Sequence, residues 1–123
     1  MPQYLVAGYI PDNFDPSTVD EATMEEIMEE IHALNREMIA AGVRKLAGGL
    51  GPTHTLRAQP NGELLLTDGP YLETKEHIGG LWILETANMD EALAWARKCA
   101  KACRNSMEVR EILFMPAPNE PAE

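Results

Sequence analysis

The sequence predicts an α+β domain in which two helices cover one face of an antiparallel sheet. Two stretches repeat apolar residues at every third or fourth position, which is typical of amphipathic helices. The other apolar segments are short and bounded by Gly, Pro, Asn or Asp, as strands are. With 123 residues and 45% hydrophobic content, the chain is one ordinary domain that needs no disulfide or metal to fold.

A strand over residues 3–10 opens the domain, and a helix follows it after a loop rich in Pro and Asp. The strand is apolar at even and at odd positions, which indicates that both of its faces are covered. Thr23 and Glu26 have the spacing of a capping box at the start of the helix, and a start near Ser17 is the alternative. Gly42 is placed to end the helix as a left-handed cap.

A hairpin is predicted next, after a short strand over residues 43–50. Residues 60–62, Pro-Asn-Gly, fit a three-residue loop. This loop places His54 opposite Asp68, and strand alternation then puts both on the apolar face of the hairpin. A slip of one residue in the register would separate the pair.

The most apolar strand starts at residue 78 or 79 and runs to residue 86, so it is expected at the centre of the sheet. Asn88 predicts the start of a second helix that runs to about Cys103. Cys99 and Cys103 fall on one face of this helix, where neighbouring thiols usually fill the core. A last strand is predicted over residues 107–115.

This order of elements is close to the ferredoxin-like βαββαβ fold, in which both helices lie on one face of the sheet. The first strand and residues 81–84 are nevertheless apolar on both faces. No segment remains to cover the second face, so a second copy of the chain is expected to pack against it across a two-fold axis. The sequence therefore predicts a homodimer.

Charge and length exclude several classes of partner. Twenty acidic side chains against ten basic ones give a formal net charge of −10, which disfavours binding to nucleic acid and to anionic membranes. The N-terminus opens directly into an apolar strand without a charged leader, and the longest apolar run is only a few residues. Neither a signal peptide nor a membrane-spanning helix is expected, and a cytoplasmic location is predicted.

The segment from Asp68 to Gly80 places turn residues, charges and paired glycines between two apolar strands: it contains Asp-Gly-Pro-Tyr, then Glu-Thr-Lys-Glu, then Gly-Gly. It resembles the signature of the YCII-related proteins, in the branch called DGPF, where Asp-Gly-Pro-Phe leads into Glu-Thr-Lys-Glu and a glycine-started strand. Further matches extend over nearly the whole chain: Gln3-Tyr4-Leu5, Gly42, Gly48 to Pro52, Arg57, Asp90-Glu91-Ala92 and Glu108-Val109-Arg110.

The resemblance implies a single YCII-related domain over residues 1–115 with a dimeric α/β barrel arrangement. The Pro-rich, acidic composition of residues 116–123 predicts a flexible tail after this domain. It also implies a pocket between the sheet and loops near the subunit interface. Most members of the family have no assigned reaction. Some are joined to sigma factors or encoded near them, which implies a link to sigma-factor regulation.

Asp68 and His54 are the candidate catalytic residues. A partly desolvated Asp68 at the end of the apolar hairpin face suits a general base, and His54 opposite it gives an oriented His–carboxylate pair. The alternative roles are structural. An Asp before Gly-Pro is a common turn former, and the histidine can lie at the rim in water.

The candidate ligand-binding residues are Arg57, Tyr71, Glu73, Lys75, Glu76, Glu108 and Arg110. The glutamates beside Lys75 favour its ammonium form, so it is expected to hold a ligand carboxylate or enolate rather than to form a Schiff base. A surface ion pair is the alternative for Lys75. Tyr71 stands where the family signature has Phe, and its hydroxyl can hydrogen-bond a ligand.

Two further strands carry the remaining candidates. Glu108 and Arg110 point the same way from the last strand and can form an ion pair that reaches the cleft. Arg57 lies on the hairpin face opposite to His54, where it can meet an anionic group. A solvated edge charge is the alternative for each of them.

Two functions fit these residues. The first is a cofactor-independent enzyme of the isomerase or lyase kind that acts on a small molecule, with Asp68 or His54 as the base and Lys75 or Arg110 as a cationic clamp. The alternative is a noncatalytic module that binds a small molecule or a protein partner. No zinc-binding or nucleotide-binding motif occurs, so neither a metal nor a cofactor is expected.

Overall fold

A computed structural model describes residues 1–11, 14–69 and 76–115 of the chain. The elements follow in the order β1 (Gln3–Pro11), a short 3₁₀ helix η1 (Pro16–Thr18), α1 (Glu21–Ala41), β2 (Arg44–Gly49), β3 (His54–Ala58), β4 (Leu64–Asp68), β5 (Glu76–Glu85), α2 (Met89–Cys103) and β6 (Met107–Glu111). The predicted α+β fold is confirmed. The predicted tail over residues 116–123 lies outside the described residues.

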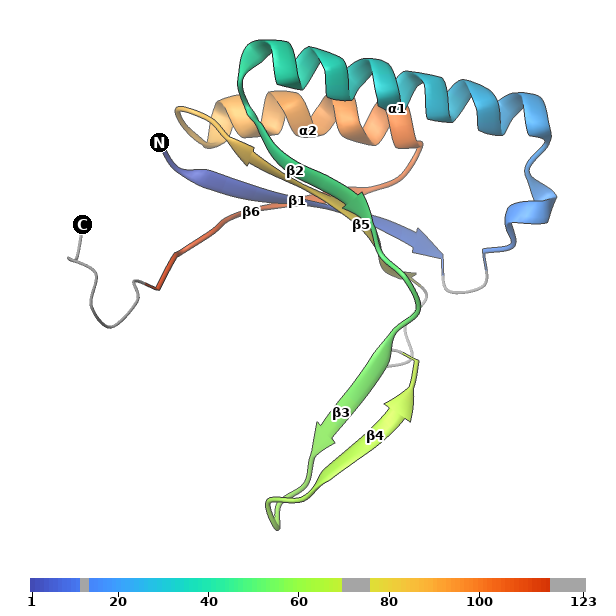
Figure 1. Ribbon diagram of the computed structural model, residues 1–123, viewed down its shortest axis with the longest axis vertical. Coiled ribbons are helices and arrows are strands. Elements are labelled where there is room, and N and C mark those ends of the chain that lie inside the picture. Colours follow the sequence, from blue (N-terminus) through green and yellow to red (C-terminus); the bar gives the residue numbers. More distant parts are fainter. Residues whose placement is uncertain (12–13, 70–75, 116–123) are drawn as a thin grey trace.

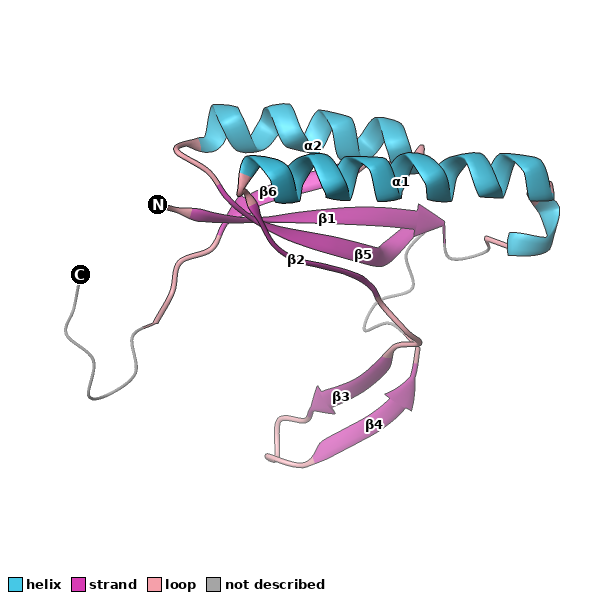
Figure 2. Cartoon of the chain, turned by 45° about the horizontal axis from the view of Figure 1, so that its top comes forward, coloured by secondary structure: helices cyan, strands magenta, loops and turns pink. Residues whose placement is uncertain are grey.

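A four-stranded antiparallel sheet forms the base of the domain, in the order β2-β5-β1-β6. Both helices lie on the same face of this sheet (Figures 1 and 2). This is the ferredoxin-like arrangement, with β3 and β4 inserted as an extra hairpin between β2 and β5. β5 is an inner strand, as its apolar sequence predicts. None of the described helices is long and apolar enough to span a membrane.

The hydrophobic core lies between the sheet and the two helices. Val6 and Leu84 from the inner strands are fully buried there, together with Met38 of α1 and Cys99 of α2. The prediction that the cysteines fill the core is confirmed, because both are free thiols, Cys99 buried and Cys103 half-buried. Burial raises the pKa of the Cys99 thiol to about 12, so this thiol stays protonated and unreactive near neutral pH.

Neither α1 nor α2 lies on the other face of the sheet, which we call the outer face. The strand register places Leu5, Leu81 and Ile83 on it, beside Leu46 at the β2 edge. Leu46 is 49% exposed, and the other three side chains are half-buried. The single chain therefore has the apolar second face that the sequence predicts.

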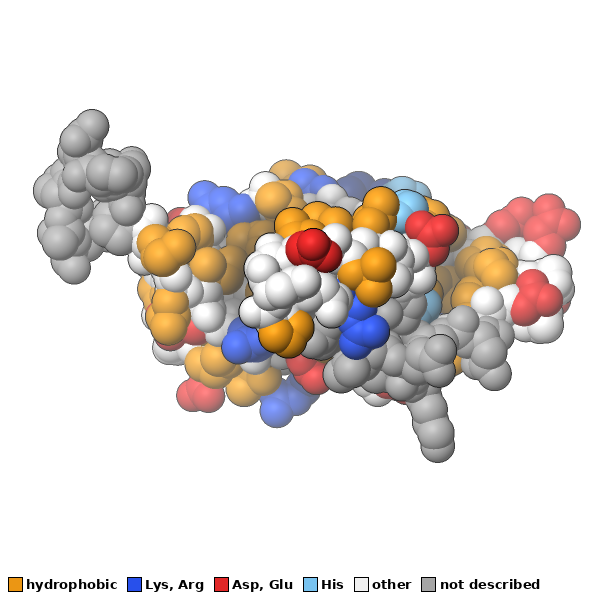
Figure 3. All heavy atoms as spheres, turned by 90° about the horizontal axis from the view of Figure 1, so that it is seen from below, with side chains coloured by type: hydrophobic (Ala, Val, Ile, Leu, Met, Phe, Trp, Pro, Cys, Tyr) orange, Lys and Arg blue, Asp and Glu red, His pale blue; other side chains and the backbone are white. Residues whose placement is uncertain are grey.

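β3 and β4 form a separate two-stranded hairpin over residues 54–68, which we call the arm. It projects from the side of the sheet that lacks helices (Figures 1 and 2). Leu56, Leu64 and Leu66 share one face of the arm and are 63%, 65% and 63% exposed, and hydrophobic side chains are visible on and beside it in Figure 3. Among the described residues, no helix or strand outside the arm covers this apolar face.

The predicted register of the arm is confirmed. Gln59 donates its backbone N–H to the Glu63 carbonyl at 2.8 Å, and Gly62 has the left-handed φ of 88° that the three-residue loop requires. His54 consequently faces Asp68 across the two strands. The three-residue loop is thus compatible with the observed register, as the sequence predicts.

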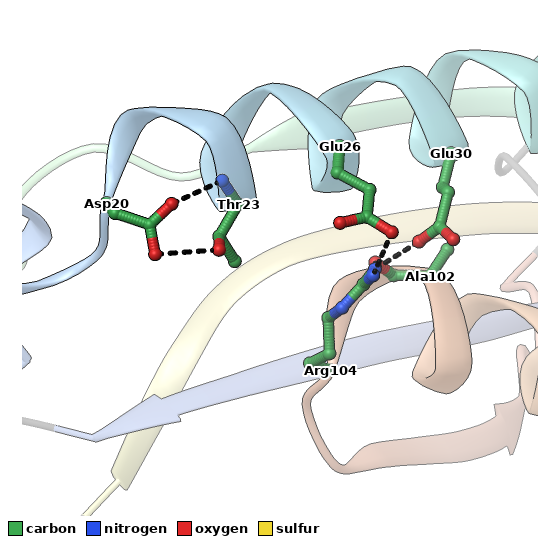
Figure 4. Close-up of polar contacts among 6 residues, drawn as sticks. All are labelled: Asp20, Thr23, Glu26, Glu30, Ala102 and Arg104. Atoms are coloured by element: carbon green, nitrogen blue, oxygen red, sulfur yellow. Dashed lines mark hydrogen bonds and ion pairs between the residues drawn. The ribbon is translucent and has the colours of Figure 1, made fainter.

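α1 begins at a different cap from the predicted one. Asp20 is the N-cap: its Oδ1 accepts the N–H of Thr23 at 2.7 Å and its Oδ2 accepts the Thr23 hydroxyl at 2.9 Å (Figure 4). The predicted capping box of Thr23 and Glu26 is wrong, because Asp20 supplies two acceptors one turn earlier. The alternative start near Ser17 falls in the separate η1 turn. The left-handed cap at Gly42, with φ of 74°, is confirmed.

The cap makes the stability depend on pH through Asp20. The backbone N–H of Thr23 holds the pKa of Asp20 below its usual value. The stabilisation is therefore fully present above the unfolded pKa of about 4, and it is lost as the pH falls through the lower folded value. Asp20→Asn still caps the helix but does not titrate, so the difference in Tm between wild type and variant should shrink on acidification from about pH 6 to pH 2. The Tm values are measured in thermal melts followed by circular dichroism. A Tm difference that stays the same between about pH 6 and pH 2 would contradict this expectation.

Two strand ends differ from the predicted ones. β5 begins at Glu76 rather than at residue 78 or 79: Gly79 forms a bulge on β5 between the pairs Gly8–Gly80 and Tyr9–Ile78, and the pairing with β1 continues beyond it to Pro11. β6 ends at Glu111 rather than at residue 115: the N–H of Ile112 still donates to the Gln3 carbonyl at 2.9 Å, and β1 begins at Gln3. Both differences arise from pairing between distant strands.

Candidate functional site

His54 and Asp68, the predicted catalytic residues, meet at the root of the arm. The Nδ1 of His54 lies 3.0 Å from the Oδ1 of Asp68, so the predicted pair is formed. Their side chains are 65% and 92% exposed, and the expectation that Asp68 is partly desolvated is wrong, because the arm stands clear of the rest of the domain (Figure 2). The pair has the orientation of a general base but not the dry surroundings of one.

The turn after β4 is held by the backbone of Gly69. This glycine has a left-handed φ of 97°, donates its N–H to the Thr53 carbonyl at 2.8 Å, and accepts the Thr55 hydroxyl at 2.6 Å. The Asp68 side chain contacts His54. The turn-forming role considered for Asp68 concerns the residues after Gly69, which lie outside the described residues, and it stays a prediction.

The charged part of the family signature is only partly described. Tyr71, Glu73 and Lys75 lie outside the described residues, and the clamp that they are expected to form stays a prediction. Glu76 is the exposed first residue of β5, opposite Pro11. Arg57 lies on the arm face opposite to His54, by the alternation of β3.

Glu108 and Arg110 lie on β6, opposite Ala7 and Leu5 of β1, and therefore on the outer face. Glu108 accepts a hydrogen bond from the Tyr9 hydroxyl at 3.0 Å, and this bond raises the pKa of Tyr9. Within the described part of the chain, the predicted ion pair between Glu108 and Arg110 is not formed. The Glu108 carboxylate instead accepts the hydrogen bond from Tyr9 on the neighbouring strand β1.

A cavity of about 850 Å³ lies on the other side of the sheet, between α1 and strands β1, β2 and β5. It is open to solvent, and its walls are mainly apolar. Its volume is within the range of about 300–1,000 Å³ found for small-molecule sites. The cavity is therefore the second candidate site of the chain.

Three glycines side by side form the floor of this cavity. Gly49 of β2 pairs with Gly80 of β5, and Gly80 pairs with Gly8 of β1, so the glycine row crosses three strands. Strand alternation places the row on the face that looks towards the helices. A Cβ on Gly80 would lie 3.1 Å from the carbonyl oxygen of Gly48, so the central position has little room for a side chain. The Met107 side chain covers the row at Gly8, where a Cβ would lie 3.1 Å from its Sδ, whereas a Cβ on Gly49 would have no atom nearer than 3.8 Å.

The roof of the cavity is the N-terminal half of α1. Met24, Ile27 and Ile31 line the cavity from successive turns of the helix. Met28 lines it as well and is 44% exposed. An apolar helix face thus lies over the glycine row of the sheet.

Arg104 holds this half of α1 against the rest of the domain. It is the C-cap of α2, and its guanidinium contacts the carboxylates of Glu26 and Glu30 on α1 (Figure 4). The same group donates a hydrogen bond to the Ala102 carbonyl at 2.6 Å. The position of the roof is therefore fixed by contacts outside the cavity floor.

The end of the cavity nearest the core is polar. The Oδ1 of Asn35 accepts hydrogen bonds from the Nε of Arg44 at 2.9 Å and from the Nε1 of Trp82 at 3.1 Å. The side-chain nitrogen of Asn35 donates a hydrogen bond to the Ile31 carbonyl at 2.9 Å, so both polar atoms of this side chain have hydrogen-bond partners. Because these residues come from α1, β2 and β5, the network joins the helix to the sheet where the cavity ends.

The cavity contains none of the described residues that the sequence singles out as site candidates: His54, Arg57, Asp68, Glu76, Glu108 and Arg110. The glycine pairs at residues 48–49 and 79–80 indicate only strand ends when they are read along the chain. Their role as a floor becomes visible once the pairing of the strands is known. The signal in the sequence is the recurrence of glycine near the cavity end of three strands, together with a helix rich in Met and Ile.

Comparison with known proteins identifies the family. Residues 3–116 match the model of the YCII-related domain. The chain is also 37% identical over 98 residues to an uncharacterized protein of Rhizobium meliloti (strain 1021), a match that covers 75% of this chain and 78% of that protein. The family match includes the two-helix sheet, the arm and the segment from Asp68 to Gly80. The chain therefore belongs to the YCII-related domain family.

Proposed function

We propose that the protein binds a small, largely apolar molecule in the cavity below α1. The glycine row carries this proposal. Protein interiors are normally close-packed, yet three neighbouring strands place glycines at paired positions under an apolar helix face, beside about 850 Å³ of open space. An apolar cavity with a few polar groups at one end is the usual form of a small-molecule site.

A thermal-shift screen against a metabolite library tests the proposal. A ligand at about 100 times its Kd should stabilise the fold by about 2.7 kcal/mol, which raises the Tm of a domain of this size by several degrees. Trp82 is 6% exposed and lines the cavity, so a bound ligand should also change its fluorescence. The Trp95→Phe variant leaves Trp82 as the single tryptophan. Ligands that raise the Tm without a change in Trp82 fluorescence would contradict binding in the cavity.

The functional unit that we propose is a homodimer. The outer face presents Leu5, Leu81 and Ile83 without a covering helix, and the arm exposes its leucines on the same side of the sheet (Figure 3). A second copy packed sheet to sheet across a two-fold axis would cover the outer faces of both chains and bring each arm beside the partner. The family resemblance implies the same arrangement.

Catalysis is the second candidate function, and the contact between His54 and Asp68 favours it. With Asp68 accepting the hydrogen on Nδ1, the Nε2 of His54 can take a proton from a substrate. Such a base suits a cofactor-independent isomerase or lyase. In the proposed dimer the arm lies beside the partner, which would remove the pair from bulk water.

Substitution of the pair separates an enzyme from a noncatalytic binding module. If the pair is the base, His54→Ala and Asp68→Asn should lower the turnover of a ligand found in the screen by about 10²–10⁴-fold, with little change in its affinity. Glu63→Gln, which removes another exposed acid of the arm, is the control. Turnover is followed by NMR of the ligand. Unchanged turnover in His54→Ala would exclude this base, and a ligand that is bound but never converted supports the noncatalytic module.

A further inference from the structure

Arg44 is a cation in the cavity without an acidic partner. It extends from β2 at the polar end, where its Nε donates to Asn35. Within the described part of the chain, no carboxylate forms an ion pair with it. No described side chain contains a buried polar atom without a hydrogen bond. The two terminal nitrogens of Arg44, for which the described residues show no partner, are therefore not fully buried, and Arg44 lines the cavity.

The neighbouring basic residues differ from Arg44 in this respect. Arg104 also lines the cavity, but Glu26 and Glu30 neutralise it. Lys45, the next residue along β2, lies 3.6 Å from the Glu85 carboxylate. In a chain with twice as many acidic as basic side chains, Arg44 therefore stands out as a cation of the cavity that is left for a ligand.

We propose that the ligand is an amphipathic monocarboxylate whose carboxylate binds Arg44 and whose apolar body lies between the glycine row and α1. The inference rests on the proposed function of the cavity and adds the class of ligand. A guanidinium binds a carboxylate through two parallel N–H groups. Asn35 holds Arg44 by its Nε, which leaves the terminal nitrogens for this contact. Met24, Ile27 and Ile31 supply apolar contacts for the rest of the molecule.

The charges around the cavity favour a group with one negative charge. Among the described residues that line the cavity, Arg44 is an arginine without an ion pair, whereas the carboxylates of Glu26 and Glu30 lie on the side of Arg104. A phosphate group with two charges would be only half neutralised and would lose hydration without compensation. A carboxylate matches the one available guanidinium.

Two probes of the same shape test the inference, phenylbutyrate and the neutral phenylbutyramide. Isothermal titration calorimetry near neutral pH is expected to show at least about tenfold tighter binding of the carboxylate to the wild-type protein, as for a charge-assisted hydrogen bond. Arg44→Gln should lower the affinity for phenylbutyrate to that for the amide and leave the amide affinity nearly unchanged. Arg97→Gln removes the same charge from the exposed surface of α2 and should alter neither affinity.

The variants are compared after circular dichroism has shown that they fold. Arg44→Lys, which keeps the charge but not the two-pronged geometry, should retain part of the preference for the carboxylate. Equal affinities of the two probes for the wild-type protein, or a full preference that persists in Arg44→Gln, would overturn the inference and leave the binding of small molecules intact. A wild-type protein that binds neither probe also overturns it. If the metabolite screen then finds no ligand that changes the fluorescence of Trp82, the proposed function fails as well.

Discussion

The Gly49→Leu variant is expected to lose ligand binding in the cavity while it keeps its fold. Gly49 is the β2 member of the glycine row, and a Cβ on it would have the Gly79 carbonyl oxygen, at 3.8 Å, as its nearest neighbour. Its φ is not left-handed, so the backbone accepts a leucine without strain. The added carbons enter the space that the ligand needs. Overfilling a packed space costs about 1–3 kcal/mol, so the affinity should fall roughly tenfold to a hundredfold.

A leucine at a nearby glycine outside the cavity is the matched control. Gly51 follows β2 in a loop, and nothing lies within 4 Å of a Cβ at this position, so Gly51→Leu should bind the ligand as the wild type does. Gly49→Ala should lie between the wild type and Gly49→Leu. Titration calorimetry with a ligand from the screen measures all three. Unchanged affinity in Gly49→Leu would show that the ligand binds elsewhere.

The Ile83→Asp variant is expected to be monomeric. Ile83 lies on the outer face of β5, between Leu5 of β1 and Leu46 of β2. In the proposed dimer an aspartate there would be buried without a partner, which costs several kcal/mol, so the dimer should weaken by about a hundredfold or more. Light scattering at micromolar concentration distinguishes one chain from two.

The same substitution on the helix side controls for the effect of the charge itself. Ile39 lies on α1 and is 60% exposed, so Ile39→Asp should remain dimeric. Circular dichroism establishes that both variants are folded. A wild-type protein that is monomeric at micromolar concentration would contradict the dimer, and so would an Ile83→Asp variant that stays dimeric.

Local signals made most of the fold predictable from the sequence. The apolar repeats give the two helices, and Gly42 and Asn88 mark an end and a start that the structure confirms. The loop at residues 60–62 sets the register of the arm and thereby the contact between His54 and Asp68. Each of these features depends on residues that are near one another in the chain.

The sequence did not predict the features that depend on residues far apart in the chain or on competition between local hydrogen bonds. Asp20 caps α1 because it competes successfully with the capping box that starts at Thr23. The glycine row joins residues 8, 49 and 80, which meet only after three strands have paired. The exposure of Asp68 depends on the direction in which the arm projects, and hairpin register does not determine that direction.

Selective isotope labelling of glycine tests the binding of a ligand in the cavity most directly. The chain has nine glycines, and five of them line the cavity: Gly8, Gly48, Gly49, Gly79 and Gly80. The remaining four, Gly42, Gly51, Gly62 and Gly69, lie elsewhere. In an NMR titration, a ligand from the screen is expected to shift the amide signals of the five cavity glycines and to leave the other four unchanged. Shifts at Gly62 and Gly69, without change at Gly8, Gly49 and Gly80, would place the ligand on the arm and contradict binding in the cavity.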